Sequence, residues 1–157
     1  AVASALRAAR VAVATSVLNP SPVGEGTALV GDADVVVVNQ HEAAELLGEA
    51  VATRSDRAMD QASRLRRPDQ TVIVTLGAAG LVACDADGQH VVAGRKVDTV
   101  DTVDTTGAGD CFLGVLAAGL AERRGLHEAL LRANRAAAIS VTRLGTVAAM
   151  PLAAELD

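Results

Sequence analysis

Apolar residues along this chain gather in short runs that polar or turn-forming residues separate. The clearest run is Val35–Val38, which Asp32–Asp34 precede and Asn39 follows. A continuous run of β-branched residues of this length is typical of a strand buried on both faces of a parallel sheet. Two more strands are predicted, one over the β-rich stretch Val11–Leu18 and one over Thr71–Leu76. Helices should therefore cover both faces of this sheet.

The segments between these strands have the composition and the stop signals of helices. We predict helices over residues 1–10, 40–47, 55–67, 106–122 and 126–144. Gly48 ends the second of them and Pro68 the third. Leu81–Cys84 and Gln89–Ala93 predict a hairpin. Because strands and helices alternate and the connections are short, we expect a single α/β domain over residues 1–157, with a mainly parallel sheet flanked by helices on both faces.

Composition narrows the class of protein. Hydrophobic residues make up 50% of the chain and charged residues 21%, which excludes intrinsic disorder, collagen and disulfide frameworks. The net charge is −5 and Phe112 is the single aromatic residue, so no nucleic-acid surface is expected. Arg7 and Arg10 interrupt the apolar start of the chain, so no membrane span is expected. Cys84 and Cys111 indicate reduced thiols of a cytoplasmic protein, with a disulfide between them as the alternative.

The strongest candidate for chemistry is the segment Asp104-Thr105-Thr106-Gly107-Ala108-Gly109-Asp110. Its two glycines permit the close approach of a ligand, and the free N–H groups at the start of the following helix would point at that ligand, which predicts an anion-binding cradle. A carboxylate such as Asp110 is a poor neighbour for a phosphate unless it accepts a proton from an attacking hydroxyl, as a general base does in phosphoryl transfer. The alternative is a plain glycine turn whose acidic residue complements the helix dipole.

The whole segment, continued by Phe112 and Gly114, resembles the second signature of the ribokinase-like (PfkB) carbohydrate kinases. Three other stretches occur in the family's order, namely Asn19-Pro20-Ser21-Pro22, Asn39-Gln40-His41-Glu42 and Thr75-Leu76-Gly77-Ala78-Ala79-Gly80. The first is most similar to its counterpart in the ribokinase branch of the family. The resemblance implies a ribokinase-like fold, of which this chain would be the C-terminal, nucleotide-binding portion without the N-terminal sugar-binding half and its lid.

By this resemblance, the chain takes part in the ATP-dependent phosphorylation of a sugar hydroxyl. Asp110 would accept the hydroxyl proton, and backbone N–H groups would stabilise the transferring phosphoryl group. These N–H groups belong to the stretch of Gly107, Ala108, Gly109 and Asp110. Asp110 and this stretch are therefore the predicted catalytic residues.

The resemblance also assigns residues to the nucleotide and to Mg²⁺. Asn39 and Glu42 would help to hold Mg²⁺ and the phosphates through water, and their spacing equally suits a helix N-cap with its reciprocal partner. Asn134 would lie beside the adenine, with an exposed helical Asn of no special role as the alternative. A further stretch would border the ATP phosphates and ribose, or would form an ordinary turn after a strand. Its residues are Thr75, Leu76, Gly77, Ala78, Ala79 and Gly80.

Members of this family often bind a monovalent cation next to the anion cradle, which makes K⁺ a candidate cofactor beside ATP and Mg²⁺. Several of the matching positions would contribute main-chain carbonyls. They are Asp104, Thr106, Ser140, Arg143 and Gly145. The chain departs from the family's pattern at Ala149, where many members have Ser, and this change removes one oxygen ligand.

Other catalytic and nucleotide-binding motifs do not occur in the chain. Lys96, the single lysine, is not part of a Gly-x-x-x-x-Gly-Lys-Ser/Thr sequence, which excludes a P-loop. No Gly-x-Gly-x-x-Gly follows a strand, which argues against a dinucleotide site. His41, His90 and His127 lie on unrelated segments and are interpreted as surface or capping residues. Cys111 is interpreted as a packing residue.

Two other functions stay open at this point. A nucleoside kinase of the same family, such as an adenosine kinase, would carry the same motifs, and a non-catalytic nucleotide-binding remnant would keep the cradle alone. We expect ATP and a small sugar as ligands, and neither nucleic acid nor membrane as a partner. Because half of a doubly wound sheet exposes an apolar edge and face, we expect the chain to need its missing N-terminal half or to form a homo-oligomer.

Overall fold

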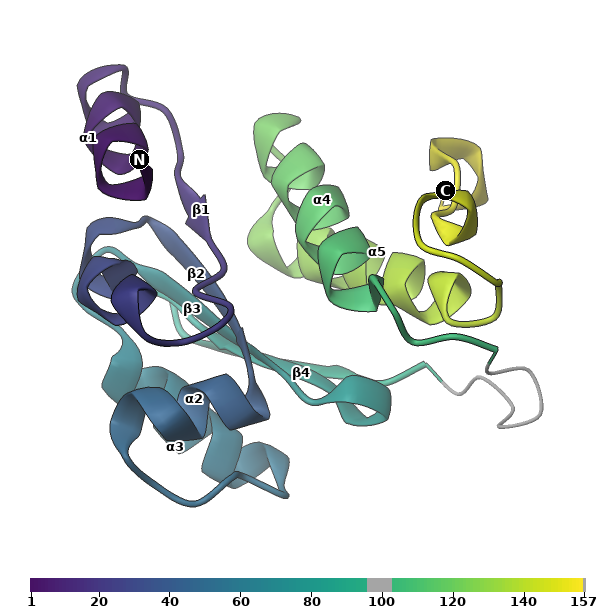
Figure 1. Ribbon diagram of the computed structural model, residues 1–157, viewed down its shortest axis with the longest axis horizontal. Helices are drawn as coiled ribbons and strands as arrows, with labels where there is room; N and C mark the ends of the chain where they lie inside the picture. The colour runs from purple at the N-terminus through teal and green to yellow at the C-terminus, as the bar shows by residue number, and fades with distance from the viewer. Residues whose placement is uncertain (96–102, 157) are drawn as a thin grey trace. The chain divides into compact units, whose positions relative to one another are not determined.

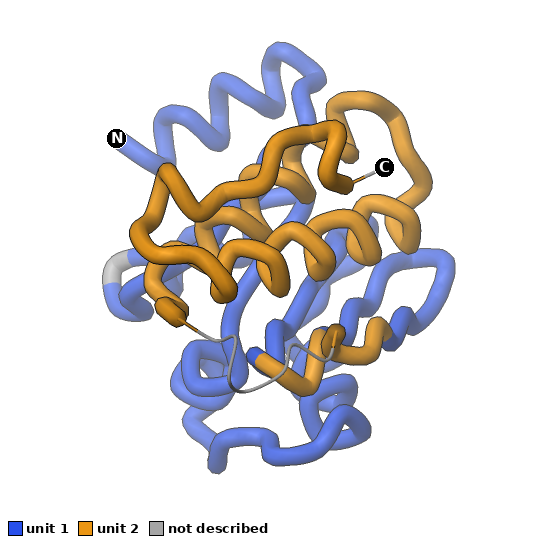
Figure 2. Tube along the Cα trace, turned by 90° about the vertical axis from the view of Figure 1, so that its right-hand side faces the viewer, with its two compact units in different colours: residues 1–77, 81–91 blue, residues 78–80, 92–157 orange. Residues whose placement is uncertain are grey.

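A computed structural model of the protein describes residues 1–95 and 103–156, so Lys96 lies outside the described residues. The chain divides into two compact units. Figure 2 shows unit 1, which comprises residues 1–77 and 81–91, and unit 2, which comprises residues 78–80 and 92–157.

Figure 1 shows the helices and strands of the chain. The helices are α1 (Val2–Val11), α2 (Gln40–Leu47), α3 (Ser55–Leu65), α4 (Ala108–Ala121) and α5 (Leu126–Ser140). The strands are β1 (Val17–Leu18), β2 (Val35–Asn39), β3 (Thr71–Thr75), β4 (Gly80–Cys84) and β5 (Gln89–Ala93). Short 3₁₀ helices are η1 (Glu25–Asp32), η2 (Gly77–Ala79), η3 (Val147–Ala149) and η4 (Ala153–Glu155). Among the described helices, none combines the length and the apolar character needed to cross a bilayer.

The strands form one sheet in the order β1-β2-β3-β4-β5. β1 runs parallel to β2, and β2 runs parallel to β3, whereas β4 pairs antiparallel with β3. The expected α/β fold with a mainly parallel, helix-flanked sheet and an antiparallel addition is therefore confirmed. Asn39 and Thr75 are register partners at the carboxyl ends of β2 and β3, which is the edge where sheets of this kind bind ligands.

The core of unit 1 lies between the sheet and its helices. Alternate strand residues, among them Val36, Val38, Val72, Val74 and Val82, pack in one cluster with alanines of α2 and α3. Residues on the other face of the same strands, Val35, Val37 and Ile73, are also at most 5% exposed. The valine run is thus buried on both faces, as its sequence predicts.

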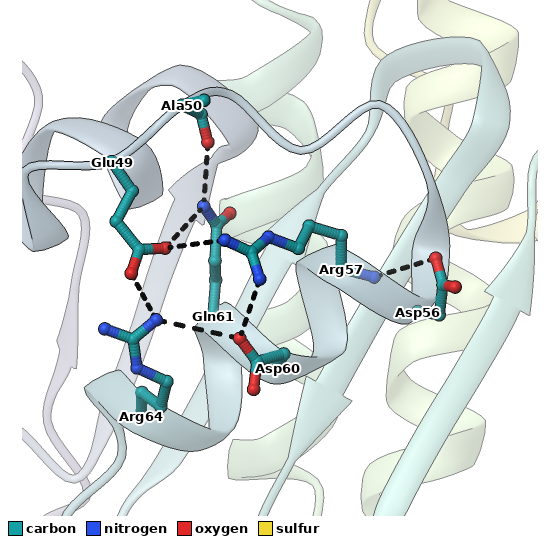
Figure 3. A network of polar contacts seen from close by, with 7 residues as sticks. All are labelled: Glu49, Ala50, Asp56, Arg57, Asp60, Gln61 and Arg64. Atoms are coloured by element: carbon teal, nitrogen blue, oxygen red, sulfur yellow. Dashed lines mark hydrogen bonds and ion pairs between the residues drawn. The ribbon is translucent and has the colours of Figure 1, made fainter.

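A network of charged side chains covers the outer side of α3 and ties it to the loop after α2 (Figure 3). Glu49 forms ion pairs with Arg57 and Arg64, both of which also pair with Asp60. The hydrogen bond from Arg64 holds the pKa of Glu49 below its usual value. Gln61, beneath this network, is fully buried and donates through Nε2 to the carbonyl of Ala50 at 3.1 Å. The network ties α3 to the loop that connects it to α2.

The strand predicted over Val11–Leu18 is mostly wrong, because only Val17–Leu18 pairs with β2. Val11 is the last residue of α1, and Val13 has a φ of 55°, which ends the helix in a left-handed turn. The N–H of Ala14 then donates to the carbonyl of Ala9 at 2.9 Å. Val11 and Val13 are 86% and 94% exposed, so their side chains follow the helix end and not a buried strand. β-Propensity was overridden here by helix termination.

Other boundaries also differ from the sequence prediction; α4, for example, spans Ala108–Ala121 and not 106–122. The last helix ends at Ser140 and not at Leu144, because the carbonyl of Val141 accepts the N–H groups of Val103 at 2.8 Å and Asp104 at 3.3 Å. α3 ends at Leu65 because the residue before Pro68 is disfavoured in helical conformation and Arg66 is already extended. β3 ends one residue early, at Thr75, and η1 was not predicted.

Candidate active site

The predicted anion cradle forms the start of α4 in unit 2. Gly107 is the N-cap with a φ of 78°, a left-handed conformation that favours glycine. The N–H of Ala108 donates to the carbonyl of Thr105 at 3.3 Å, and the N–H of Cys111 donates to the carbonyl of Gly107 at 2.8 Å. The first-turn N–H groups of Gly109 and Asp110 have no acceptor within the helix. A Cβ atom added at Gly109 would meet nothing within 4 Å, so the cradle is open on this side.

The loop that leads into the cradle is held by Asp104. Its Oδ1 accepts the N–H of Thr106 at 2.9 Å. Hydrogen bonds from the Thr106 N–H and hydroxyl, and from the N–H of Gly145, hold the pKa of Asp104 below its usual value. A Cβ atom at Gly107 would lie 3.4 Å from the Thr146 methyl group, so residues 145–146 stand directly beside the cradle.

Asp110 lies in the first turn of α4 with its side chain exposed, which leaves the carboxylate accessible to a ligand. Its neighbour Cys111 is 2% exposed and packs in a cluster with Ala136 and Leu156. Burial raises the pKa of the Cys111 thiol, against the reactive thiolate form. The structure agrees with the interpretation of Cys111 as a packing residue, and both cysteines are free thiols.

Asn39 and Glu42 form a capping box at the junction of β2 and α2 in unit 1. Asn39 Oδ1 accepts the N–H groups of His41 at 2.8 Å and Glu42 at 2.9 Å, while Glu42 Oε2 accepts the N–H of Asn39 at 2.8 Å. The alternative interpretation of this pair as a helix cap is thus confirmed. Thr75, the register partner of Asn39, donates its hydroxyl to the carbonyl of Val38 at 3.4 Å. Oxygen-bearing side chains therefore gather where β2 and β3 end.

The stretch 75–80 continues from β3 through the one-turn helix η2. Within unit 2, a Cβ atom at Gly80 would lie 2.1 Å from the carbonyl oxygen of Val92, so only glycine fits this backbone crossing. The N–H of Gly94 donates to the carbonyl of Ala79 at 3.0 Å. This part of the stretch is therefore a close-packed turn, as the alternative interpretation states.

Asn134 in helix α5 has a side-chain hydrogen bond. Its Nδ2 donates to the carbonyl of Ala93 at 3.0 Å, which ties the middle of α5 to the end of β5 within unit 2. The bond fixes the orientation of the amide, and the predicted contact with adenine stays a prediction.

Of the positions matched to a monovalent cation site, Asp104, Thr106 and Gly145 come together in unit 2. The Ser140 hydroxyl instead donates to the carbonyl of Ala137 at 2.8 Å. The Arg143 guanidinium forms an ion pair with Glu155. Within residues 1–95 and 103–156, no cluster of three or more His, Cys, Asp and Glu side chains could hold a metal ion.

The predicted site residues thus form two groups, one in each unit (Figure 2). Unit 1 contains Asn39, Glu42, Thr75, Leu76 and Gly77, and unit 2 contains Ala78, Ala79, Gly80, Asn134 and all the residues of the cradle. Sequence reasoning missed Thr146 and Glu155, which lie in irregular segments with no motif of their own. The sequence indicates Asn19 only as part of a motif. In the structure its Nδ2 donates to the carbonyl of Val37 at 2.8 Å, which ties the end of β1 to β2.

Comparison with known proteins agrees with the fold and the motifs. A family model described as pfkB family carbohydrate kinase matches residues 1–153. The ribokinase of Staphylococcus aureus (strain COL) is 33% identical over 161 residues, which cover 100% of this chain and 51% of that protein. The chain therefore spans about half the length of this curated relative.

Two solved structures show the same similarity. The ribokinase from Cryptococcus neoformans var. grubii serotype A in complex with ADP matches with a TM-score of 0.84 and 26% identity, over 99% of this chain and 55% of that chain. The aminoimidazole riboside kinase from Salmonella enterica, complexed with aminoimidazole riboside and an ATP analog, matches with a TM-score of 0.78 and 27% identity, over 98% of this chain and 54% of that chain.

Proposed function

The chain belongs to the pfkB family of carbohydrate kinases, and we propose that it carries the nucleotide-binding part of an ATP-dependent kinase that phosphorylates a hydroxyl of a small sugar. The observation that carries this proposal is the start of α4, where an exposed carboxylate, Asp110, lies in the same turn as N–H groups without helical acceptors. The open side at Gly109 leaves room for a phosphate to approach these N–H groups.

In the proposed reaction, the Asp110 carboxylate accepts the proton of the sugar hydroxyl. The hydroxyl oxygen forms a bond to the terminal phosphorus of ATP, the bond from that phosphorus to the bridging oxygen breaks, and ADP leaves with the electron pair. The N–H groups of Gly109 and Asp110 stabilise the charge on the transferring phosphoryl group. Gly107 and Ala108 hold the turn in which these groups lie.

Mg²⁺ fits the residues at the end of β2, because a hydrated hard cation prefers oxygen ligands and the capping box engages only Oε2 of the Glu42 carboxylate. We propose that Glu42 and Asn39 hold it through water. When bound, Mg²⁺ neutralises phosphate charge during phosphoryl transfer. The pair also keeps its capping role, so Glu42→Gln tests the metal role only if the stability of α2 is measured in parallel.

For K⁺, the fit is weaker. Asp104 offers a carboxylate, but hydrogen bonds from Thr106 and Gly145 already engage it, and Ala149 provides no hydroxyl. We therefore assign K⁺ no step, and the expectation is tested by comparing turnover in KCl with turnover in tetramethylammonium chloride.

The acceptor is proposed to be a ribose-like sugar, in line with the Staphylococcus aureus relative. A nucleoside is the second candidate, because the similar Salmonella enterica enzyme was crystallised with aminoimidazole riboside. The residues 75–80 and Asn134 are proposed to contact ATP, in line with the ADP complex of the Cryptococcus neoformans ribokinase. Since the chain spans about half of its relative, we also propose that sugar binding needs a further sugar-binding half or a second copy of the chain.

A coupled ADP-release assay with ribose, fructose, deoxyribose and adenosine tests the proposal, on this chain and on any longer natural form that contains it. Asp110→Asn should remove most turnover and leave ATP binding, measured by calorimetry, nearly unchanged. If the variant keeps more than about a tenth of wild-type turnover, Asp110 is not the general base, since such bases contribute roughly 10²- to 10⁴-fold. Tight ATP binding by the wild type without transfer to any acceptor would favour the non-catalytic remnant.

A further inference from the structure

The last described residues of the chain are held to α5 by hydrogen bonds within unit 2. We name residues 152–156 the C-terminal strap. Arg132 donates to the carbonyl of Ala153 at 3.4 Å, and Arg135 donates to the carbonyl of Leu156 at 3.2 Å. Arginine side chains from successive turns of α5 thus fasten the backbone of the strap to the helix.

One side chain of the strap reaches the loop behind the cradle. Glu155 forms a two-pronged ion pair with Arg143, whose Nη1 lies 3.4 Å from Oε2 and whose Nη2 contacts Oε1. Oε2 of Glu155 also accepts the N–H of Leu152 at 2.7 Å, which holds the carboxylate in place. Arg143 lies in the same loop as Gly145 and Thr146. The N–H of Gly145 donates to Asp104, and the Thr146 methyl group would lie 3.4 Å from a Cβ atom added at Gly107. The ion pair therefore anchors the loop against which the cradle is built.

A second side chain of the strap lies behind the first turn of α4. Leu156 is 7% exposed and packs in the cluster of Cys111 and Ala136, with Val115 and Ile139 at its border. Cys111 directly follows Asp110, and its N–H closes the turn by donating to the carbonyl of Gly107. Leu156 thus supports the turn that carries the carboxylate and the free N–H groups.

We propose that Glu155 and Leu156 are positioning residues for the phosphate cradle, Glu155 through the loop at residues 143–146 and Leu156 through Cys111. The inference rests on the proposed function for its catalytic consequence, while its structural claim concerns unit 2 alone. The hydrogen bond from Arg143 also holds the pKa of Glu155 below its usual value, so the carboxyl is charged in this ion pair. In-line transfer tolerates little displacement of the reacting groups. A loosened cradle should therefore lower turnover clearly while it changes the free energy of unfolding little.

The test compares Glu155→Ala with a matched control, Glu122→Ala. Glu122 forms an ion pair of similar exposure with Arg124, in the same unit but at the other end of α4. Hydrogen exchange of the peptides that cover residues 103–112 is measured by mass spectrometry for both variants. Glu155→Ala should speed exchange of the Thr106 N–H group, which the Asp104 loop holds, about tenfold, and Glu122→Ala should leave it unchanged. Equal exchange in the two variants would overturn the inference, whether or not the chain is an active kinase.

Turnover supplies the second measurement. Glu155→Ala should lower kcat about tenfold with a smaller change in the KM for ATP, and the charge swap Arg143→Glu with Glu155→Arg should restore part of the loss. If the wild type neither binds ATP nor transfers phosphate while the exchange result holds, the proposed function fails and the positioning of the cradle stands. If Glu155→Ala does not fold, the same two measurements are made on Leu156→Val, which removes the equivalent of one methylene group from the cluster that contains Cys111 and Ala136.

Discussion

Gly109 allows the fold and the ligand to be tested separately. An added Cβ atom at this position meets nothing within 4 Å, so Gly109→Ala introduces no clash in the protein. Alanine replaces glycine in a helix with a gain of up to about 1 kcal/mol, which raises the midpoint of thermal unfolding by roughly 2–4 °C in a chain of this size. The same methyl group occupies the space through which we propose that a phosphate approaches. Losing one charge-assisted hydrogen bond costs about 1.5–3 kcal/mol, or roughly 10- to 100-fold in ATP affinity or turnover.

The matched control is Gly114→Ala, later in the same helix, where an added Cβ atom also meets nothing within 4 Å. Calorimetry with ATP, the coupled ADP assay and thermal unfolding are measured for both variants. Both should be at least as stable as the wild type, and only Gly109→Ala should lose ATP affinity or turnover. Should Gly109→Ala bind ATP and turn over like Gly114→Ala, the open side of Gly109 is not where the phosphate lies, and the kinase mechanism proposed for this helix fails.

Two further predictions concern the stability of unit 1. Gln70 is 3% exposed and donates through Nε2 to the carbonyls of Val30 at 2.7 Å and Ala33 at 2.8 Å. Gln70→Leu leaves both carbonyls unpaired and should lower the free energy of unfolding by about 2–4 kcal/mol. A urea titration that shows a loss below about 1 kcal/mol would contradict this prediction. Hydrogen bonds from the hydroxyl and the N–H of Ser16 hold the pKa of Asp34 below its usual value. A carboxyl whose pKa is lower in the folded state stabilises the fold at pH values above its unfolded-state pKa, and this gain is lost as the pH falls through its folded-state pKa. Asp34→Asn should therefore be less stable than the wild type at pH 7, and the difference in stability between the two proteins should shrink below about pH 4. A difference that stays constant with pH would show that the charge of Asp34 does not contribute.

The elements that the sequence predicted well are those set by local signals. The valine run 35–38 needs only its composition to indicate a buried strand, and Asn39 and Glu42 need only their spacing to indicate a capping box, which forms with both reciprocal hydrogen bonds. The start of α4 was likewise predictable, because the glycines and the acidic residue that make it are consecutive in the chain. In each case the residues that determine the structure lie within a few positions of one another.

Two of the differences from the prediction arise where a distant residue decides the structure. The end of α5 depends on Val103 and Asp104, which donate to Val141 from a segment almost 40 residues earlier in the chain, and no property of residues 140–144 indicates this. The role of Glu155 depends in the same way on Arg143, since both lie in irregular segments that have no periodicity. The error at Val11 and Val13 has a local cause. Valine favours a strand, whereas the left-handed turn at Val13 places both side chains in solvent.

The capping and metal-binding interpretations of Asn39 and Glu42 do not compete, although the sequence presents them as alternatives. The box engages Asn39 Oδ1 and Glu42 Oε2, and it fixes both side chains at the carboxyl edge of β2 before any ligand arrives. A carboxylate that is already oriented by the backbone loses less conformational entropy when it binds a hydrated cation than a free side chain would. The cap would therefore favour the Mg²⁺ binding that we propose for this pair. It also predicts that Glu42→Asp, which keeps the charge but shortens the reach to the N–H of Asn39, should weaken metal-dependent ATP binding as well as the start of α2.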